Sequence, residues 1–233
     1  IPDEIETITY ATGVLALPYW ISALISDDAA SFAGLLGTSK QFTFSFPSTI
    51  PSYYEDNKYS VNFGSVNTLG QSNISTFFAS LASIIDVSFV ESSSTSQLNN
   101  ISIWLADLEE GVAGNAGYPH DDFDASDIKI DNDTGSPSEG DRSSHVFIHE
   151  LGHALGLRHP FSGPSAGADG ESASPPYLSA SEDNGTWTQM TYDDTSSDYV
   201  FEFRPLDIAA LQYIYGVSNT ARAGDDTYYI SQA

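Results

Sequence analysis

Four of the chain's five histidines lie in one short stretch, HVFIHELGHALGLRHP. His149 and His153 are four residues apart, so on a helix both imidazoles face the same side, one turn apart, and can share a metal ion. Glu150 lies beside this pair, where it can reach a metal-bound water without binding the metal itself. Gly156 can adopt the left-handed conformation that ends a helix, so the chain can turn back and bring His159 to the same ion. Three neutral imidazoles and one open position are typical of a catalytic zinc site.

The alternative for this cluster is a set of buried histidines that only make hydrogen bonds, which leaves the regular spacing unexplained. His145 lies one turn before His149 on the same helical face, and we expect it to pack at the helix start rather than bind metal. His120 lies in YPHDDFDASD, beside clustered carboxylates. A calcium site is one interpretation of that segment, and we favour the other, a solvated acidic loop.

Five fixed positions of the stretch, in the order His-Glu-x-x-His-x-x-Gly-x-x-His, match the motif of the metzincin zinc metalloproteases. The RHP at its end, the single methionine Met190, and Tyr192 two residues later resemble the serralysin branch of that family (peptidase family M10). RPLDIAALQYIYG and the following TARAGDDTYY resemble the serralysin C-terminal helix and the entry to its calcium-binding repeat domain. The resemblance is clear over residues 143–228 and extends more weakly back to Gln41. The G-G-x-G-x-D repeats of that domain are missing from this chain.

The resemblance implies a catalytic site with one zinc ion, whose ligands would be His149, His153 and His159. It implies that Glu150 is the general base and then the proton donor, and that Met190 forms the methionine turn beneath the zinc. Tyr192 would either bind the zinc at rest or support the oxyanion during the reaction.

The resemblance also implies a substrate strand and a second type of metal. An extended peptide would pair through main-chain hydrogen bonds with an edge strand formed by Ala113, Gly114, Asn115, Ala116 and Gly117. A structural calcium ion would be held by oxygens at the positions of Arg222, Gly224 and Asp226.

Short helices and strands must position these side chains. Alternating or β-branched and aromatic residues predict strands at 41–47, 86–90, 101–106 and 127–130, and glycine-rich residues 111–119 fit an irregular edge strand. Apolar residues three, four and seven apart predict a helix that is capped by Ser72 or Asn73 and continues to Ile85. Further helices are expected from Ser143 or Ser144 through the histidine cluster, and over residues 205–216.

Together with the resemblance, these elements predict an α+β, zincin-like (metzincin) fold. It would have a twisted, mixed, five-stranded sheet with two long helices, an irregular lower subdomain with the methionine turn, and a C-terminal helix. We expect a catalytic domain at 1–220, divided near residue 156 into an upper subdomain and a lower one over 157–220. The start of a calcium-binding repeat tail would occupy 221–233.

Composition excludes several classes of function. The chain has 32 acidic and 7 basic residues and a formal net charge of −25, so it repels phosphate backbones, and nucleic acid is not an expected partner. No apolar run reaches the roughly 18 residues that a membrane span needs. The absence of cysteine excludes disulfides, thiolate zinc sites and a cysteine nucleophile. The acidic first residues of the chain as given do not form a signal peptide.

We therefore expect a secreted, extracellular zinc endopeptidase of the serralysin type. It would be a monomer that hydrolyses protein or peptide substrates, and a proteinaceous inhibitor is a further candidate partner. Two alternatives stay open: another metzincin protease, such as a matrixin-like enzyme, and a non-catalytic, metalloprotease-like binding module.

Overall fold

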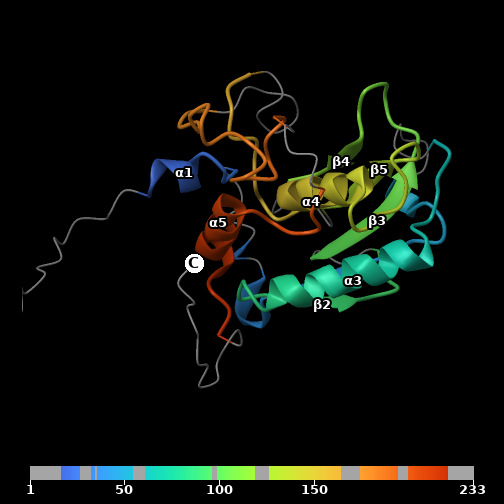
Figure 1. The fold of residues 1–233 in the computed structure, drawn as a ribbon. Helices are drawn as coiled ribbons and strands as arrows, with labels where there is room; N and C mark the ends of the chain where they lie inside the picture. Colours follow the sequence, from blue (N-terminus) through green and yellow to red (C-terminus); the bar gives the residue numbers. More distant parts are fainter. Residues whose placement is uncertain are drawn as a thin grey trace, which may run out of the picture.

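The computed structural model of the chain describes residues 17–26, 33–34, 36–54, 61–95, 99–118, 126–163, 174–193 and 199–219. Its elements are, in chain order, α1 (Tyr19–Ser22), η1 (Gly37–Ser39), β1 (Gln41–Ser45), η2 (Ser52–Tyr54), α3 (Thr68–Ala82), β2 (Ser88–Glu91), β3 (Asn100–Ala106), β4 (Gly114–Ala116), β5 (Ile128–Asp131), α4 (Arg142–Ala154) and α5 (Pro205–Tyr215). Figure 1 shows their arrangement. Within these ranges, every helix is too short or too polar to cross a membrane.

The strands form one mixed sheet in the order β2-β1-β3-β5-β4. The pairs β1–β2, β1–β3 and β3–β5 are parallel, and β4 pairs antiparallel with β5, with Asn115 opposite Lys129. This confirms the predicted α+β class and the mixed, five-stranded sheet. It also places β4 at the edge of the sheet, as the glycine-rich segment predicted.

Alternation along the strands gives the sheet two different faces. Phe44 pairs with Ile101, and Ile103 pairs with Ile128, and these apolar side chains belong to the core that α3 and α4 complete. The alternate positions form a polar and aromatic face, which consists of Thr43, Ser45, Asn100, Ser102, Trp104 and Lys129. The core therefore lies on one side of the sheet, where α4 can pack against β4 and β5.

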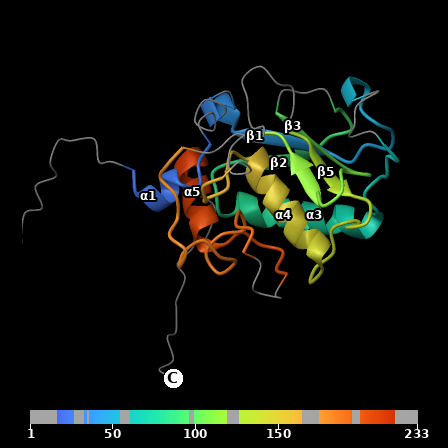
Figure 2. The ribbon, with the colours of Figure 1, turned by 90° about the horizontal axis from the view of Figure 1, so that it is seen from above.

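Aromatic rings join the helices to each other. Phe77 and Phe78 of α3 each lie 6.3 Å from Phe147 of α4, measured between ring centroids. Helix α5 stands beside the ends of α3 and α4 in both views (Figures 1 and 2). Its last residue, Tyr215, is buried, and its hydroxyl donates to the carbonyl of Leu155, 2.9 Å away, just after α4. This contact holds α5 against the end of the helix that carries the histidines.

Helix α3 begins five or six residues earlier than the apolar pattern predicted, so the expected cap at Ser72 or Asn73 is wrong. Asn67 is the N-cap, and its Oδ1 accepts the backbone N–H of Gly70 at 2.8 Å. The first turn lacks a large buried apolar side chain, and Gly70 packs where a Cβ would lie 2.8 Å from Val66 Cγ1. A search for apolar periodicity therefore misses this turn.

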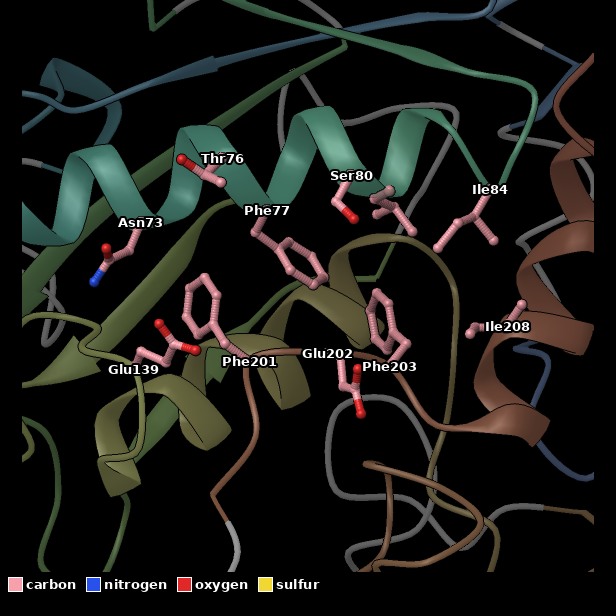
Figure 3. A pocket seen from close by; sticks show the side chains of 11 residues that line it. Asn73, Thr76, Phe77, Ser80, Ile84, Glu139, Phe201, Glu202, Phe203 and Ile208 are labelled. Atoms are coloured by element: carbon pink, nitrogen blue, oxygen red, sulfur yellow. The ribbon is translucent and has the colours of Figure 1, made fainter. Parts of the chain in front are cut away.

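A cavity of about 330 Å³ lies between α3 and the segment Phe201–Phe203 (Figure 3). The rings of Phe77, Phe201 and Phe203 line it, and the carboxylates of Glu139 and Glu202 stand on the side opposite α3. None of the clustered histidines lines this cavity.

Candidate metal centre

The end of α4 turns the chain back toward its own histidines. Gly156 has φ of 96°, a conformation that favours glycine. Its N–H donates to the carbonyl of His153 at 2.9 Å, and the N–H of Leu157 donates to the carbonyl of Gly152 at 2.8 Å. This pair of bonds is a Schellman motif, which satisfies the last carbonyls of the helix and stops it abruptly. The turn expected from the sequence at Gly156 is therefore present.

The residues after this turn are held by main-chain and side-chain bonds. Leu157 pairs with Ile25, and the N–H of Arg158 donates to the carbonyl of Leu24 at 2.8 Å. The buried guanidinium of Arg158 donates to the carbonyls of Ser174 and Ser22, at 2.7 and 3.1 Å. The sequence analysis did not assign a role to Arg158. The one feature that could have indicated a role is that this charged residue directly precedes the proposed ligand His159. These bonds fix the direction in which the next side chain points.

The structure brings His149, His153 and His159 together, and all three are buried. Nε2 of His159 lies 3.0 Å from Nε2 of His149 and 3.1 Å from Nε2 of His153. The Nδ1 atoms of His149 and His153 lie 2.7 and 2.8 Å from the carbonyl oxygens of Gln189 and Leu157. Because a carbonyl can only accept, each Nδ1 carries the proton, and each Nε2 directs a lone pair toward the centre of the cluster.

This donor set fits one zinc ion. Three imidazole nitrogens at zinc–nitrogen distances of 2.0–2.1 Å in a tetrahedral site lie about 3.3 Å apart, close to the spacing found here. Burial, together with the nearby His159, lowers the pKa of His149 to about 3. Burial also holds the pKa of His153 well below its usual value. The imidazoles of His149 and His153 are therefore neutral, which is the form that binds metal.

Glu150 lines the same cleft as His149 and packs against the edge strand. Its side chain is buried, and its carboxylate accepts the backbone N–H of Ala116 in β4. Burial raises the pKa of Glu150 to about 8, and the charge of Lys129 and the bond from Ala116 oppose that rise. Gly114 of β4 packs so closely that a Cβ there would lie 2.7 Å from Glu150 Cγ. The carboxyl is thus held beside β4, the outer strand of the sheet in the described part of the chain.

Lys129 is a buried lysine beneath this edge, which sequence reasoning treated only as part of a short strand. Its Nζ lies 3.4 Å from Asn115 Oδ1 and 4.9 Å from the centre of the Tyr54 ring. Burial lowers its pKa to about 8, against the charges of Asp127 and Glu150.

Met190 lies under the histidine helix. It is fully buried, and a Cβ built at Gly152 would overlap its sulfur and lie 3.2 Å from its Cε. The residue before it, Gln189, provides the carbonyl that orients His149. Gln189 acts through its main chain, so its side-chain type gave no sequence signal for this role.

Tyr192 lies beside two of the three histidines. Its ring centroid is 5.7 Å from that of His149 and 4.6 Å from that of His159, and 62% of the residue is exposed. A cleft of about 390 Å³ extends from here between β4 and α4, and it is lined by Gly111, Val112, Ala113, Gly114, Arg142, His145, Val146, His149, Glu150, Thr191 and Tyr192. His145 is thus a wall of the cleft and not a member of the triad. Of the five residues expected to form the substrate strand, Ala113 and Gly114 line this cleft, and Asn115, Ala116 and Gly117 do not.

Other predicted sites lie outside the described residues. These are the expected calcium positions Arg222, Gly224 and Asp226, and His120 in its acidic segment.

The sequence of the chain is similar to those of known metallopeptidases. The family model described as a dual-action HEIGH metallopeptidase matches residues 60–215 of the 233, well over half of the chain. A serralysin from Proteus mirabilis is 38% identical over 102 residues, which cover 40% of this chain and 20% of that protein. Serralysin C from Dickeya chrysanthemi is 36% identical over 102 residues, with the same coverage. The metalloprotease AprA from Pseudomonas entomophila is 32% identical over 106 residues, 40% of this chain and 21% of that protein.

The matched segment thus spans about a fifth of the length of these relatives. The family model, in contrast, includes the sheet edge, the histidine helix and the turn that holds Met190. The chain belongs to the HEIGH metallopeptidase family.

Proposed function

We propose that this chain is the catalytic domain of a secreted zinc endopeptidase of the serralysin type. The observation that carries the proposal is the meeting of three buried imidazole nitrogens, 3.0 and 3.1 Å apart, with a buried carboxyl group in the adjoining cleft. Among the described residues, no fourth histidine or carboxylate joins this cluster. Three protein ligands with a free fourth position are typical of catalytic zinc, whereas structural zinc has four protein ligands.

The proposed mechanism assigns one task to each group of the cleft. When bound, zinc supplies Lewis acidity, which polarises water and the scissile carbonyl group. The free edge of β4 binds an extended substrate through main-chain hydrogen bonds. Glu150 takes a proton from the attacking water and returns it to the leaving amine. Tyr192 donates a hydrogen bond to the developing oxyanion.

Further parts of the proposal rest on the resemblance to serralysins. They are secretion, a monomeric state, protein or peptide substrates, a proteinaceous inhibitor, and a structural calcium ion at Arg222, Gly224 and Asp226. The net charge of −25 supports divalent-cation binding and solubility.

The two alternatives are less well supported. The position of Tyr192 beside His149 and His159 favours the serralysin branch over other metzincins. A binding module without catalysis has no need of a buried carboxyl group next to a metal cluster, because burying such a group costs free energy.

The test is the substitution Glu150→Gln, which keeps the size of the side chain and removes the base. We expect the variant to retain one zinc per chain and its thermal unfolding midpoint, and to lose casein hydrolysis by about 10²-fold or more. Glu139→Gln, at an exposed glutamate that lines the separate cavity behind α3, is the matched control and should keep full activity. A chelator should abolish hydrolysis by the original chain. Cleavage by Glu150→Gln at the control's rate would contradict the role of base, and cleavage in excess chelator would contradict the whole proposal.

A further inference from the structure

The turn that carries Gln189 and Met190 has a second point of attachment, away from the metal cluster. The Gln189 side chain donates through Nε2 to the carbonyl of Glu202 at 2.9 Å. Its main-chain N–H donates to Oδ2 of Asp207 at 2.7 Å, and its carbonyl accepts Nδ1–H of His149. One residue thus connects a metal ligand on one side to a carboxylate on the other.

Asp207 is fully buried in the first turn of α5. Its Oδ2 also accepts the backbone N–H of Arg204 at 3.0 Å, and its Oδ1 accepts the hydroxyl of Thr188 at 2.5 Å. The Thr188 oxygen in turn accepts the backbone N–H of Met190 at 3.0 Å. The carboxylate therefore holds three consecutive residues of the turn, two of them directly and Met190 through Thr188.

The Asp207 carboxylate accepts more hydrogen bonds than the capping of helix α5 requires. A cap requires an acceptor for N–H groups of its own helix, and the bond from Arg204 already provides that contact. The bonds from Thr188 and Gln189 come from a turn that lies more than a dozen residues earlier in the chain. Because α5 is anchored in the core through Tyr215, Asp207 is a fixed point to which the turn is attached.

We propose that Asp207 is a positioning residue for the metal ligand His149, acting through the main chain of Gln189. The proposal rests on the proposed metal site and goes beyond it by naming a residue outside the cluster. When the Asp207 bonds are present, the Gln189 carbonyl has one orientation, and it fixes the tautomer and the ring plane of His149. Partners that orient metal-binding histidines typically contribute 10- to 100-fold to metal affinity.

The experiment compares zinc affinity, by chelator competition, in the wild-type chain, Asp207→Ala and Asp207→Asn. Alanine removes every acceptor, and we expect zinc to bind about 10- to 100-fold more weakly. In Asp207→Asn, the amide oxygen can replace Oδ2 and accept the N–H groups of Gln189 and Arg204, and the amide nitrogen can donate to the Thr188 oxygen. This variant should therefore recover most of the zinc affinity. If Asp207→Ala does not fold, Thr188→Val is the second test, because it removes the hydroxyl that fixes the Asp207 carboxylate against the turn directly before Gln189. We expect Thr188→Val to weaken zinc binding and Thr188→Ser to restore it.

A matched control separates positioning from general stability. Asp127 is also a buried carboxylate, which accepts the Ser102 N–H at 2.8 Å and the Tyr53 hydroxyl at 2.9 Å. It lies at β5, away from the turn, so Asp127→Ala should lower thermal stability without changing zinc affinity.

Nuclear magnetic resonance of the histidine ring N–H groups in the metal-free protein gives a second readout. Asp207→Ala should shift the Nδ1–H signal of His149 and speed its exchange with water. The corresponding signal of His153 should stay unchanged, because its acceptor is the carbonyl of Leu157.

The outcomes distinguish this inference from the proposed function. Tight zinc binding by the wild-type chain and by Asp207→Ala alike would refute the inference and leave the proposed function intact. Equal losses in Asp207→Ala and Asp127→Ala would reduce Asp207 to a stabilising residue and also refute the inference. A wild-type chain that binds no zinc would refute both.

Discussion

Gly114 offers a direct test of how closely the edge strand is fitted to the proposed general base. A Cβ at this position would lie 2.7 Å from Glu150 Cγ, 2.7 Å from Val146 Cγ1 and 2.9 Å from Glu150 Oε1, whereas ordinary contacts begin near 3.4 Å. Relief of the first overlap alone requires a movement of about 0.7 Å, the difference between 3.4 and 2.7 Å. Since a misplacement of about 1 Å can cost 10²-fold in rate, we expect Gly114→Ala to lower kcat/KM by about 10- to 100-fold.

The stability of the same variant should fall much less markedly than its activity. Overpacking typically costs about 1–3 kcal/mol, and each kcal/mol lowers Tm by about 2–4 °C for a chain of this size. The assay is hydrolysis of a quenched fluorescent peptide, with zinc content and Tm measured on the same samples. Gly34→Ala is the control, because a Cβ there meets nothing within 4 Å. If Gly114→Ala and Gly34→Ala have the same kcat/KM, the close packing of β4 against Glu150 is not what positions the base.

Three further predictions concern residues around the cluster. Gly152→Ala should displace Met190 and lower stability by about 1–3 kcal/mol in urea unfolding, and a shorter side chain at 190 should recover part of that loss. Tyr192→Phe should keep zinc content and Tm, lower kcat by about 10²-fold, and change KM less than it changes kcat. An unchanged kcat in steady-state assays would mean that Tyr192 has only a packing role. Lys129 has a folded pKa of about 8 against 10.5 when exposed, so the folded state binds fewer protons and wild-type stability should rise between these pH values. The free energy of unfolding should rise by up to about 3 kcal/mol in the wild-type chain, and this rise should be absent in Lys129→Met. If plots of the free energy of unfolding against pH are parallel for the two proteins, the prediction is wrong.

The part of the site that could be predicted from the sequence is the part that one helix and its cap determine. His149 and His153 come together because a helix repeats every 3.6 residues, and the turn at Gly156 then returns the chain toward them. Each step uses neighbouring residues only. The spacing was therefore enough to predict that His159 joins the cluster, although the bonds from Arg158 to Leu24 and Ser22, which hold it there, could not be predicted.

The supporting residues could not be predicted in this way, because their roles depend on contacts between distant segments. Gln189 orients His149 through a carbonyl group, which every residue type possesses. Asp207 looks like an acidic residue in the first turn of a helix, a common and stabilising position. Its contact with Thr188 becomes visible only when α5 is packed against the turn.

The strands show the same division. Alternating residues indicated β1 and β3, and the glycine-rich composition indicated the edge position of β4. The start of α3 was missed because the bond between Asn67 and Gly70 replaces apolar packing in its first turn.

The free edge of β4 also has a consequence for how copies of this protein meet in solution. An exposed strand edge can pair with the edge of another molecule and so begin aggregation. Here the strand is three residues long, Gly114–Ala116, and the chain around it carries a net charge of −25. Two copies therefore repel each other before their edges can touch, while an uncharged or basic peptide approaches freely. Because salt screens this repulsion over a distance of about 8 Å at physiological ionic strength, we expect self-association and self-cleavage to increase as salt is added.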